Sequence, residues 1–269
     1  MNTVNKAIQW VVQSNLTNTE NLHDLKAACE NIGIRYTEVA IIPFSRELPA
    51  FDILPGNIYY GSTTFNNLLF NDVRTSGGVF FNPATFTIEN YIMQWGKHML
   101  NADAEVTTFI KLAAKNYAAD TLLFIRPDDD SKSFAGEVKK FNEISEWYKK
   151  LEGLANEGLS AGTKIIVSQP YNIQSEWRLW IVNKKVIAAS KYRTYFKLTK
   201  ERGCPGAVKA FAEERCSEYT PHDVFVMDVC LCGDAYYIVE CGCMNGAGFY
   251  DADIEKIVEG VSNYFTPYL

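Results

Sequence analysis

Over residues 224–243 the chain reads VFVMDVCLCGDAYYIVECGC, which is two apolar runs separated by Gly233-Asp234. This pattern predicts a β-hairpin, and each of its strands carries one acid, Asp228 in the first and Glu240 in the second. Burying a carboxylate is costly unless a cation or hydrogen bonds compensate its charge. Two such acids on neighbouring strands therefore favour a shared divalent cation, and their oxygen ligands favour Mg²⁺.

The register of this hairpin decides whether the two acids can meet. A two-residue turn would pair Asp228 with Val239 and would point Glu240 to the opposite face. A connection with an odd number of residues, centred on Asp234, sets Asp228 opposite Glu240 with the Cβ atoms about 4.5–5.5 Å apart. We predict the odd connection. The alternative for each acid alone is a solvated position on the polar side of a half-covered strand.

A second group of candidate residues is cationic and lies at strand ends and in one polar loop. Its members are Arg126, Lys132, Arg178, Lys191 and Arg193. Cations at strand ends and in a loop suit a polyphosphate, to which backbone N–H groups add hydrogen bonds. Each cation alone is compatible with a solvated surface. Together with the two acids, they predict a site for a magnesium–nucleotide complex.

Hydrophobic periodicity predicts a mixed α/β organisation. The first 80 or so residues alternate short strands, at 8–13, 36–42, 57–60 and 79–81, with a helix at 19–31. Helices are predicted at 88–100 and 107–119, and a strand, loop, helix and strand over 122–168. Beyond residue 169 the chain is rich in strands, with helices at 206–215 and 254–265.

Composition narrows the functional classes. The chain has 269 residues, 26 Lys and Arg against 32 Asp and Glu, and a net charge of −6, which disfavours nucleic acid and anionic membranes as partners. No apolar run approaches the roughly 20 residues that cross a bilayer, and the N-terminal residues do not resemble a secretion signal. Seven cysteines, an odd number, fit a reducing compartment, so we expect a cytoplasmic protein.

The ordered set of motifs resembles the core of the ATP-grasp ligases. It consists of Phe124-Ile125-Arg126-Pro127 with Lys132, then residues 176–182 and 186–193, then Asp228 and Glu240. The resemblance covers residues 100–269 and is greatest to a bacterial and phage clade with an arginine where most members have the first ATP-binding lysine. It implies an α+β fold in which two subdomains, 96–168 and 169–269, clasp ATP behind a small leading α/β domain, 1–95.

The resemblance also implies roles for individual residues. Arg126 and Lys132 would contact phosphates, Arg178 and Arg193 would face the γ-phosphate or the acyl phosphate, and Asp228 and Glu240 would hold Mg²⁺. The remaining nucleotide-binding residues would be Gln169, Tyr171, Ile173, Glu176 and Lys191, of which the first three lie in the hinge that holds adenine. Most members have an asparagine two residues after the glutamate, whereas this chain has Gly242. Asn245 is the nearest candidate for a third oxygen ligand, so the number of metal ions stays open.

The ATP-grasp ligases typically activate a carboxylate as an acyl phosphate, which an amine or thiol then attacks. The resemblance therefore implies an ATP-dependent carboxylate–amine ligase whose partners are amino-acid or peptide substrates, with no membrane and no indicated oligomeric state. One alternative is a nucleotide-binding module without ligase activity, which Gly242 keeps open. Another is phosphate transfer to a hydroxyl or the sealing of nucleic-acid ends, and the acidic charge balance argues against the latter.

Overall fold

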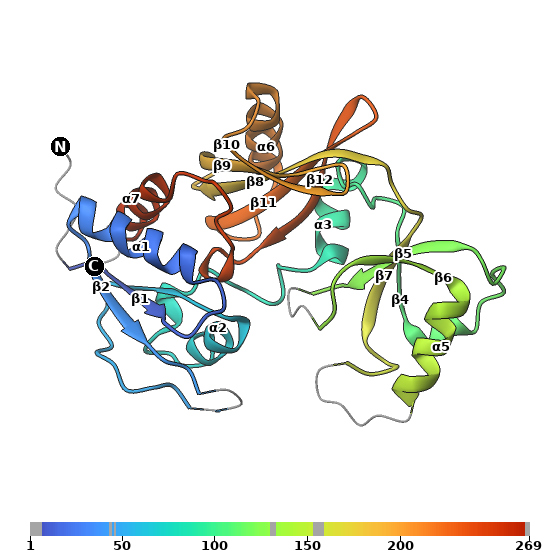
Figure 1. Cartoon of the computed structure of the whole chain (residues 1–269), viewed down its shortest axis with the longest axis horizontal. Helices are drawn as coiled ribbons and strands as arrows, with labels where there is room; N and C mark the ends of the chain where they lie inside the picture. The colour runs from blue at the N-terminus through green and yellow to red at the C-terminus, as the bar shows by residue number, and fades with distance from the viewer. Residues whose placement is uncertain (1–6, 43–44, 46, 130–132, 153–158, 267–269) are drawn as a thin grey trace.

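The computed structural model describes residues 7–42, 45, 47–129, 133–152 and 159–266. Its strands form three sheets, and helices pack against each of them (Figure 1). This arrangement confirms the predicted α+β class. Within the described residues, no helix is both long enough and apolar enough to span a membrane.

The N-terminal sheet is parallel and has the strand order β2-β1-β3. Its elements are β1 (Gln9–Gln13), α1 (Thr19–Ile32), β2 (Arg35–Val39), β3 (Asn57–Tyr60), α2 (Thr63–Phe70) and η1 (Ser76–Gly78). Helix α1 begins after Asn18, whose side chain accepts a hydrogen bond from the Asn21 N–H, and it ends at Gly33 with φ 72°. A left-handed residue at this position favours glycine because glycine has no Cβ. The predicted helix at 19–31 is confirmed.

Residues 79–81 do not form the predicted strand. The backbone N–H of Phe80 instead donates to the Asn245 side chain at 2.7 Å, and that side chain also donates to Gly78 O at 2.9 Å. A side chain from the far end of the sequence thus takes hydrogen bonds that a neighbouring strand would otherwise make. Sequence periodicity carries no information about such a partner.

The C-terminal helix α7 (Ile254–Phe265) packs beside α1 and completes the core of the N-terminal sheet (Figure 1). Trp10 of β1 donates from Nε1 to Ser262 Oγ of α7 at 3.0 Å, and both side chains are buried. The same hydrophobic cluster includes Trp180 from the strand-rich third of the chain. Packing therefore crosses the predicted boundary at residue 95.

A second sheet is antiparallel and has the order β4-β7-β5-β6. Its elements are β4 (Glu105–Thr108), α4 (Phe109–Ala113), β5 (Leu122–Pro127), β6 (Glu137–Lys140), α5 (Phe141–Glu152) and β7 (Lys164–Ser168). The predicted helix at 107–119 is confirmed only over Phe109–Ala113: Thr107 and Thr108 pair with Ile165 and Lys164 in β4, and residues 114–119 form turns and irregular backbone. Pairing with a distant strand overrides the local helical spacing here.

The third sheet has the order β10-β9-β8-β11-β12 and is antiparallel throughout. Its strands are β8 (Ile173–Val182), β9 (Lys185–Thr194), β10 (Lys197–Arg202), β11 (Val224–Cys232) and β12 (Ala235–Gly242). Helices α3 (Ile88–Trp95) and α6 (Gly206–Glu218) share one apolar cluster with it. The short helix η2 (Gly96–His98) follows α3, and η3 (Met244–Gly246) follows β12. The chain passes from β7 in the second sheet directly into β8.

The hairpin β11–β12 confirms the predicted pairing of Asp228 with Glu240 but not the predicted reason for it. Its turn is two residues long, because Cys232 pairs with Ala235. The register then shifts between Asp228 and Val229, which leaves Val239 as an extra residue on β12. Such a β-bulge redirects the side chains that follow it. Here it sets Asp228 opposite Glu240, the pairing that the predicted odd connection would also have given.

Candidate active site

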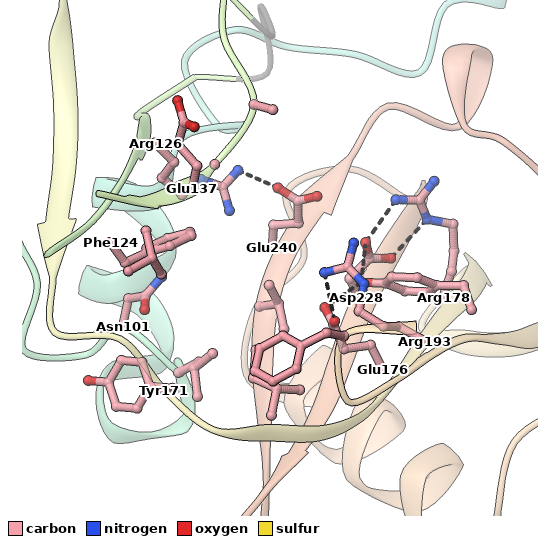
Figure 2. Close-up of a pocket in the computed structure, with 18 of the residues that line it drawn as sticks. Asn101, Phe124, Arg126, Glu137, Tyr171, Glu176, Arg178, Arg193, Asp228 and Glu240 are labelled. Atoms are coloured by element: carbon pink, nitrogen blue, oxygen red, sulfur yellow. Dashed lines mark hydrogen bonds and ion pairs between the residues drawn. The ribbon is translucent and has the colours of Figure 1, made fainter. Parts of the chain in front are cut away.

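A cavity of about 610 Å³ lies between the second and third sheets. Strands β5 and β6 line it from one side, and β8, β9, β11 and β12 line it from the other (Figure 2). Figure 2 shows Phe124 and Tyr171 on one side of the cavity, where the apolar lining residues Leu100 and Ile173 adjoin them in structure or sequence, and Asp228, Glu176, Arg178 and Arg193 on the other. A cavity with one apolar end and one charged end suits a ligand of the same polarity.

Arg178 and Asp228 form a buried ion pair in the wall formed by the third sheet. They face each other across β8 and β11, and Arg178 Nε and Nη2 each lie 2.8 Å from an oxygen of Asp228. The Asp228 side chain is 2% exposed. Burial raises the pKa of Asp228, and the Arg178 charge opposes that rise. Burial also opposes the charge of Arg178, but the Asp228 carboxylate keeps the Arg178 pKa well above its usual value.

A second pair lies on the same wall, between Glu176 and Arg193. Arg193 Nη1 lies 3.0 Å from Glu176 Oε1. Tyr192 connects this pair to the first, because its hydroxyl donates to Glu176 Oε2 at 2.8 Å and lies 3.4 Å from Asp228 Oδ2. Burial raises the pKa of Glu176 and also raises the pKa of Tyr192 well above its usual value, so Tyr192 keeps its proton as a donor.

A β-bulge in β9 explains why Tyr192 was missed and why Lys191 does not reach the cavity. Glu176 pairs with Arg193 and Trp177 with Lys191, which leaves Tyr192 as an extra residue. Both Tyr192 and Arg193 consequently line the cavity. Lys191, which strict alternation would place on the side of Arg193, instead forms an ion pair with Glu201 of β10 at 2.6 Å.

The third ion pair bridges the two sheets. Arg126 of β5 donates to Glu240 of β12 across the cavity (Figure 2). The Arg126 side chain is 14% exposed and that of Glu240 is 32% exposed, so this pair is less buried than the pair of Asp228. Three predicted cations and three predicted acids thus meet in one cavity, each acid beside an arginine.

Tyr250 is a second lining residue that the sequence did not single out. Its ring stacks on that of Tyr192 with a centroid separation of 4.8 Å and an interplanar angle of 11°. The Arg178 guanidinium carbon lies 5.2 Å from the Tyr250 ring centre, which is cation–π distance. Tyr250 has a positive φ of 55°. No local pattern in the sequence marked this position.

The remaining predicted residues divide into those the cavity includes and those it does not. Tyr171 and Ile173 line it, and their predicted contact with adenine stays a prediction. Gln169 is exposed and does not contribute to the lining. Lys132 lies outside the described residues, so its predicted phosphate contact stays a prediction. Asn101 and Phe124 also line the hinge end, and the prediction named neither as a site residue.

Asn245 is not placed to bind a metal in this cavity. It is fully buried, and its Oδ1 accepts the Phe80 N–H at 2.7 Å. Its Nδ2 donates to Tyr59 O at 2.6 Å and to Gly78 O at 2.9 Å. The carboxamide therefore ties the segment after β12 to the N-terminal sheet, and the prediction that it supplies a third metal ligand is corrected.

Replacing Asn245 by alanine is expected to lower the free energy of unfolding by about 3 kcal/mol, because three buried backbone groups lose their partner. Urea unfolding followed by circular dichroism measures this loss. The Mg²⁺ dependence of nucleotide binding is expected to stay unchanged in the folded variant. A variant of wild-type stability that has lost this dependence would instead return Asn245 to the metal site.

The cavity fits a magnesium ion held by two protein carboxylates. Asp228 and Glu240 are cross-strand neighbours that both line it. Mg²⁺ usually keeps several waters and takes one or two carboxylates plus phosphate oxygens of the substrate. Within the described part of the chain, no group of three or more His, Cys, Asp or Glu side chains is placed to ligate a metal.

Comparison with solved structures places the fold among ATP-grasp enzymes. The ATP-grasp ligase PsnB, complexed with a minimal precursor, Mg and ADP, is 11% identical, with a TM-score of 0.57 over 98% of this chain and 99% of that chain. A RiPP-associated ATP-grasp ligase of Chryseobacterium gregarium, in complex with ADP and a leader and core peptide, is 10% identical with a TM-score of 0.58 over 97% of each chain. The macrocyclase MdnC of Microcystis aeruginosa, bound with precursor peptide MdnA, is 10% identical with a TM-score of 0.53 over 97% of this chain and 100% of that chain.

At such identities the solved structures support the fold alone, and no curated protein matches the chain significantly. The family assignment comes from a sequence model of the ATP-grasp domain. This model describes family 3 of one ATP-grasp clade, and it matches residues 79–261 of the chain. That match includes every lining residue discussed above. Because it spans well over half of the chain, the chain belongs to the ATP-grasp family, in the third family of that clade.

Proposed function

We propose that this ATP-dependent ligase activates a carboxylate as an acyl phosphate and joins it to an amine, with a peptide or an amino acid as substrate. Family membership makes it an ATP-grasp ligase, with ATP and Mg²⁺ as its cofactors. The observation that carries the proposal is the meeting of Arg126, Arg178 and Arg193 with three acids in one cavity between two sheets.

The polarity of the cavity orients the nucleotide. Leu100, Phe124 and Ile173 form an apolar end that suits a purine ring. The charged part suits the triphosphate, where Arg126 would bind phosphate oxygens together with Lys132. Arg126 already pairs with an acid across the cavity, so an entering phosphate would take over a partner that Glu240 now holds.

Asp228 and Glu240 would hold Mg²⁺, which when bound neutralises negative charge on the phosphate oxygens. Arg178 holds the Asp228 carboxylate with two hydrogen bonds, and Tyr192 approaches the same carboxylate. Each carboxylate oxygen has two lone pairs, so Asp228 can keep these contacts and still present an oxygen to a cation. The ion pair therefore orients the metal ligand.

The chemical steps use arginines as electrostatic stabilisers. A substrate carboxylate oxygen attacks the γ-phosphorus, the bond to the β-phosphate oxygen breaks, and ADP leaves. Arg178 and Arg193 would stabilise the charge that spreads over the transferred phosphoryl group. An amine then attacks the acyl carbon, inorganic phosphate leaves, and the amine proton passes to solvent, which yields an amide, ADP and phosphate.

Peptides are the substrate class that the structural neighbours favour. PsnB, the Chryseobacterium gregarium ligase and MdnC were each solved with a precursor, leader or core peptide. Tyr195 and Phe196 line the cavity and are 51% and 88% exposed, so they lie where the cavity meets solvent. Exposed aromatic residues at the mouth suit a substrate that is larger than a free amino acid.

Calorimetric titration with a non-hydrolysable ATP analogue, with and without Mg²⁺, tests the nucleotide site first. ADP release is then measured with candidate amines and with peptides that carry free carboxylates, and products are identified by mass spectrometry. We expect Mg²⁺-dependent binding and ADP release that requires both substrates. Binding without ADP release across the whole panel would favour a nucleotide-controlled binding module, and no binding by the wild type would reject both.

A further inference from the structure

The hinge end of the cavity holds one buried polar side chain to which the proposed mechanism gives no role. Asn101 is 2% exposed and lines the cavity. Figure 2 shows it near Phe124 and Tyr171, on the side of the cavity away from the ion pairs of Asp228 and Glu176. A buried amide among apolar side chains is costly unless its polar atoms are bonded.

The segment that carries Asn101 is hydrogen-bonded to the third sheet, and the Asn101 side chain lies beside the end of β7 in the second. The Leu100 N–H donates to Ile238 O of β12 at 2.8 Å, and the Ala104 N–H donates to Asn101 O at 3.0 Å. Ser168, the last residue of β7, places its hydroxyl 3.3 Å from Asn101 Oδ1. The amide is therefore positioned before any ligand enters, and preorganised groups bind at a lower entropic cost.

The Asn101 amide has hydrogen-bonding capacity left over. Oδ1 has two lone pairs, and the Ser168 hydroxyl, whose single hydrogen also has Gln169 O within 3.0 Å, uses at most one of them. Nδ2 has no hydrogen-bond partner among the described residues. It is also absent from the set of fully buried side-chain atoms without a partner, so it keeps some accessible surface. In a residue that is 2% exposed and lines the cavity, such an atom faces the cavity.

We propose that Asn101 reads the edge of the adenine ring and makes the site selective for ATP over GTP, an inference that rests on the proposed ATP site. Nδ2 would donate to adenine N7, and the second lone pair of Oδ1 would accept from the N6 amine. This is the pairing through which an asparagine amide recognises adenine. Guanine presents O6 in place of the amine, so two acceptors would face each other and the wrong base would be disfavoured.

Binding of ATP, 7-deaza-ATP and GTP with Mg²⁺, measured by calorimetry without a second substrate, tests this pairing. The wild type is expected to bind ATP more tightly than either of the other two. Asn101→Leu is expected to weaken ATP binding about tenfold and 7-deaza-ATP binding by a clearly smaller factor, because 7-deaza-ATP lacks the N7 acceptor and has only the contact of its N6 amine to lose. Asn101→Asp, which loses the donor but keeps the size, is expected to weaken ATP binding as well.

Asn172→Leu is the matched control, because Asn172 is an exposed asparagine of the same hinge and does not line the cavity. It is expected to bind all three nucleotides as the wild type does. Equal losses for ATP and 7-deaza-ATP in Asn101→Leu would show a structural role and overturn the proposal, as would an unchanged ATP affinity. If Asn101→Leu does not fold, wild-type affinities that are equal for ATP and 7-deaza-ATP overturn it. Absence of any nucleotide binding by the wild type instead rejects the ATP site.

Discussion

Replacing Glu240 by glutamine is expected to lower Mg²⁺-dependent ATP turnover by on the order of 10²–10³-fold, because it removes one negative charge from the proposed metal site. Glu240 is the cleaner of the two acids to change. Its side chain is 32% exposed, whereas that of Asp228 is 2% exposed and also holds the buried Arg178. The fold of Glu240→Gln is therefore expected to stay intact, which urea unfolding checks.

ADP release at saturating ATP, measured across a range of Mg²⁺ concentrations, gives the readout for Glu240→Gln. The matched control is Glu201→Gln, because Glu201 is also an acid of the third sheet paired with a cation, but it lies outside the cavity. We expect the control to turn over ATP within about twofold of the wild type. A Glu240→Gln protein with wild-type turnover and Mg²⁺ dependence would remove Glu240 from the metal site.

Replacing Arg178 by methionine is expected to lower the free energy of unfolding by about 3–5 kcal/mol, because it leaves the buried Asp228 carboxylate without its counter-ion. Denaturant unfolding measures this loss. The double variant Arg178→Met with Asp228→Leu removes both charges and is expected to recover most of it. A single variant within about 1 kcal/mol of the wild type, or a double variant no better than the single one, would contradict this account of the pair.

The loss in Arg178→Met is expected to depend on pH. Burial already raises the pKa of Asp228 in the wild type, and without the opposing Arg178 charge that pKa rises further. A carboxyl with a raised pKa binds its proton more tightly in the folded state than in the unfolded state. The stability that this tighter proton binding by Asp228 adds to the folded state is therefore fully present below the unfolded pKa and is lost as pH rises through the folded pKa. Arg178→Met should be less destabilised at about pH 5 than at about pH 8, and the same unfolding experiment checks this.

Some features of the site could be predicted because they are local in the sequence. A lone acid in each apolar strand of a hairpin indicates a compensated charge, and the structure pairs Asp228 with Glu240. The order of Arg126, Arg178 and Arg193 along the strands likewise predicted cations that do meet in one cavity. For the buried members of this set, burial within a strand imposes a partner on the charge, and that requirement is visible without the tertiary structure.

Two of the errors at the site come from β-bulges. Strict alternation places Lys191 on the face of Arg193 and leaves Tyr192 on the other, but the extra residue in β9 reverses this for Lys191. The extra residue Val239 in β12 similarly allows a two-residue turn to coexist with the pairing of the two acids. A bulge depends on how two strands fit each other, so periodicity within one strand does not reveal it.

Other features depended on contacts between distant parts of the chain. Asn245 was a reasonable oxygen ligand near Glu240, yet its amide is hydrogen-bonded to three backbone groups of the N-terminal part of the chain, at Tyr59, Gly78 and Phe80. Asn101 reaches the hinge because Ile238 and Ser168 hold its segment between two sheets. The residue types and local patterns of this chain were thus enough to predict its fold class and the charges of its site. Which polar side chains face the cavity and which stabilise the fold was decided by tertiary packing, because every buried donor and acceptor must find a partner.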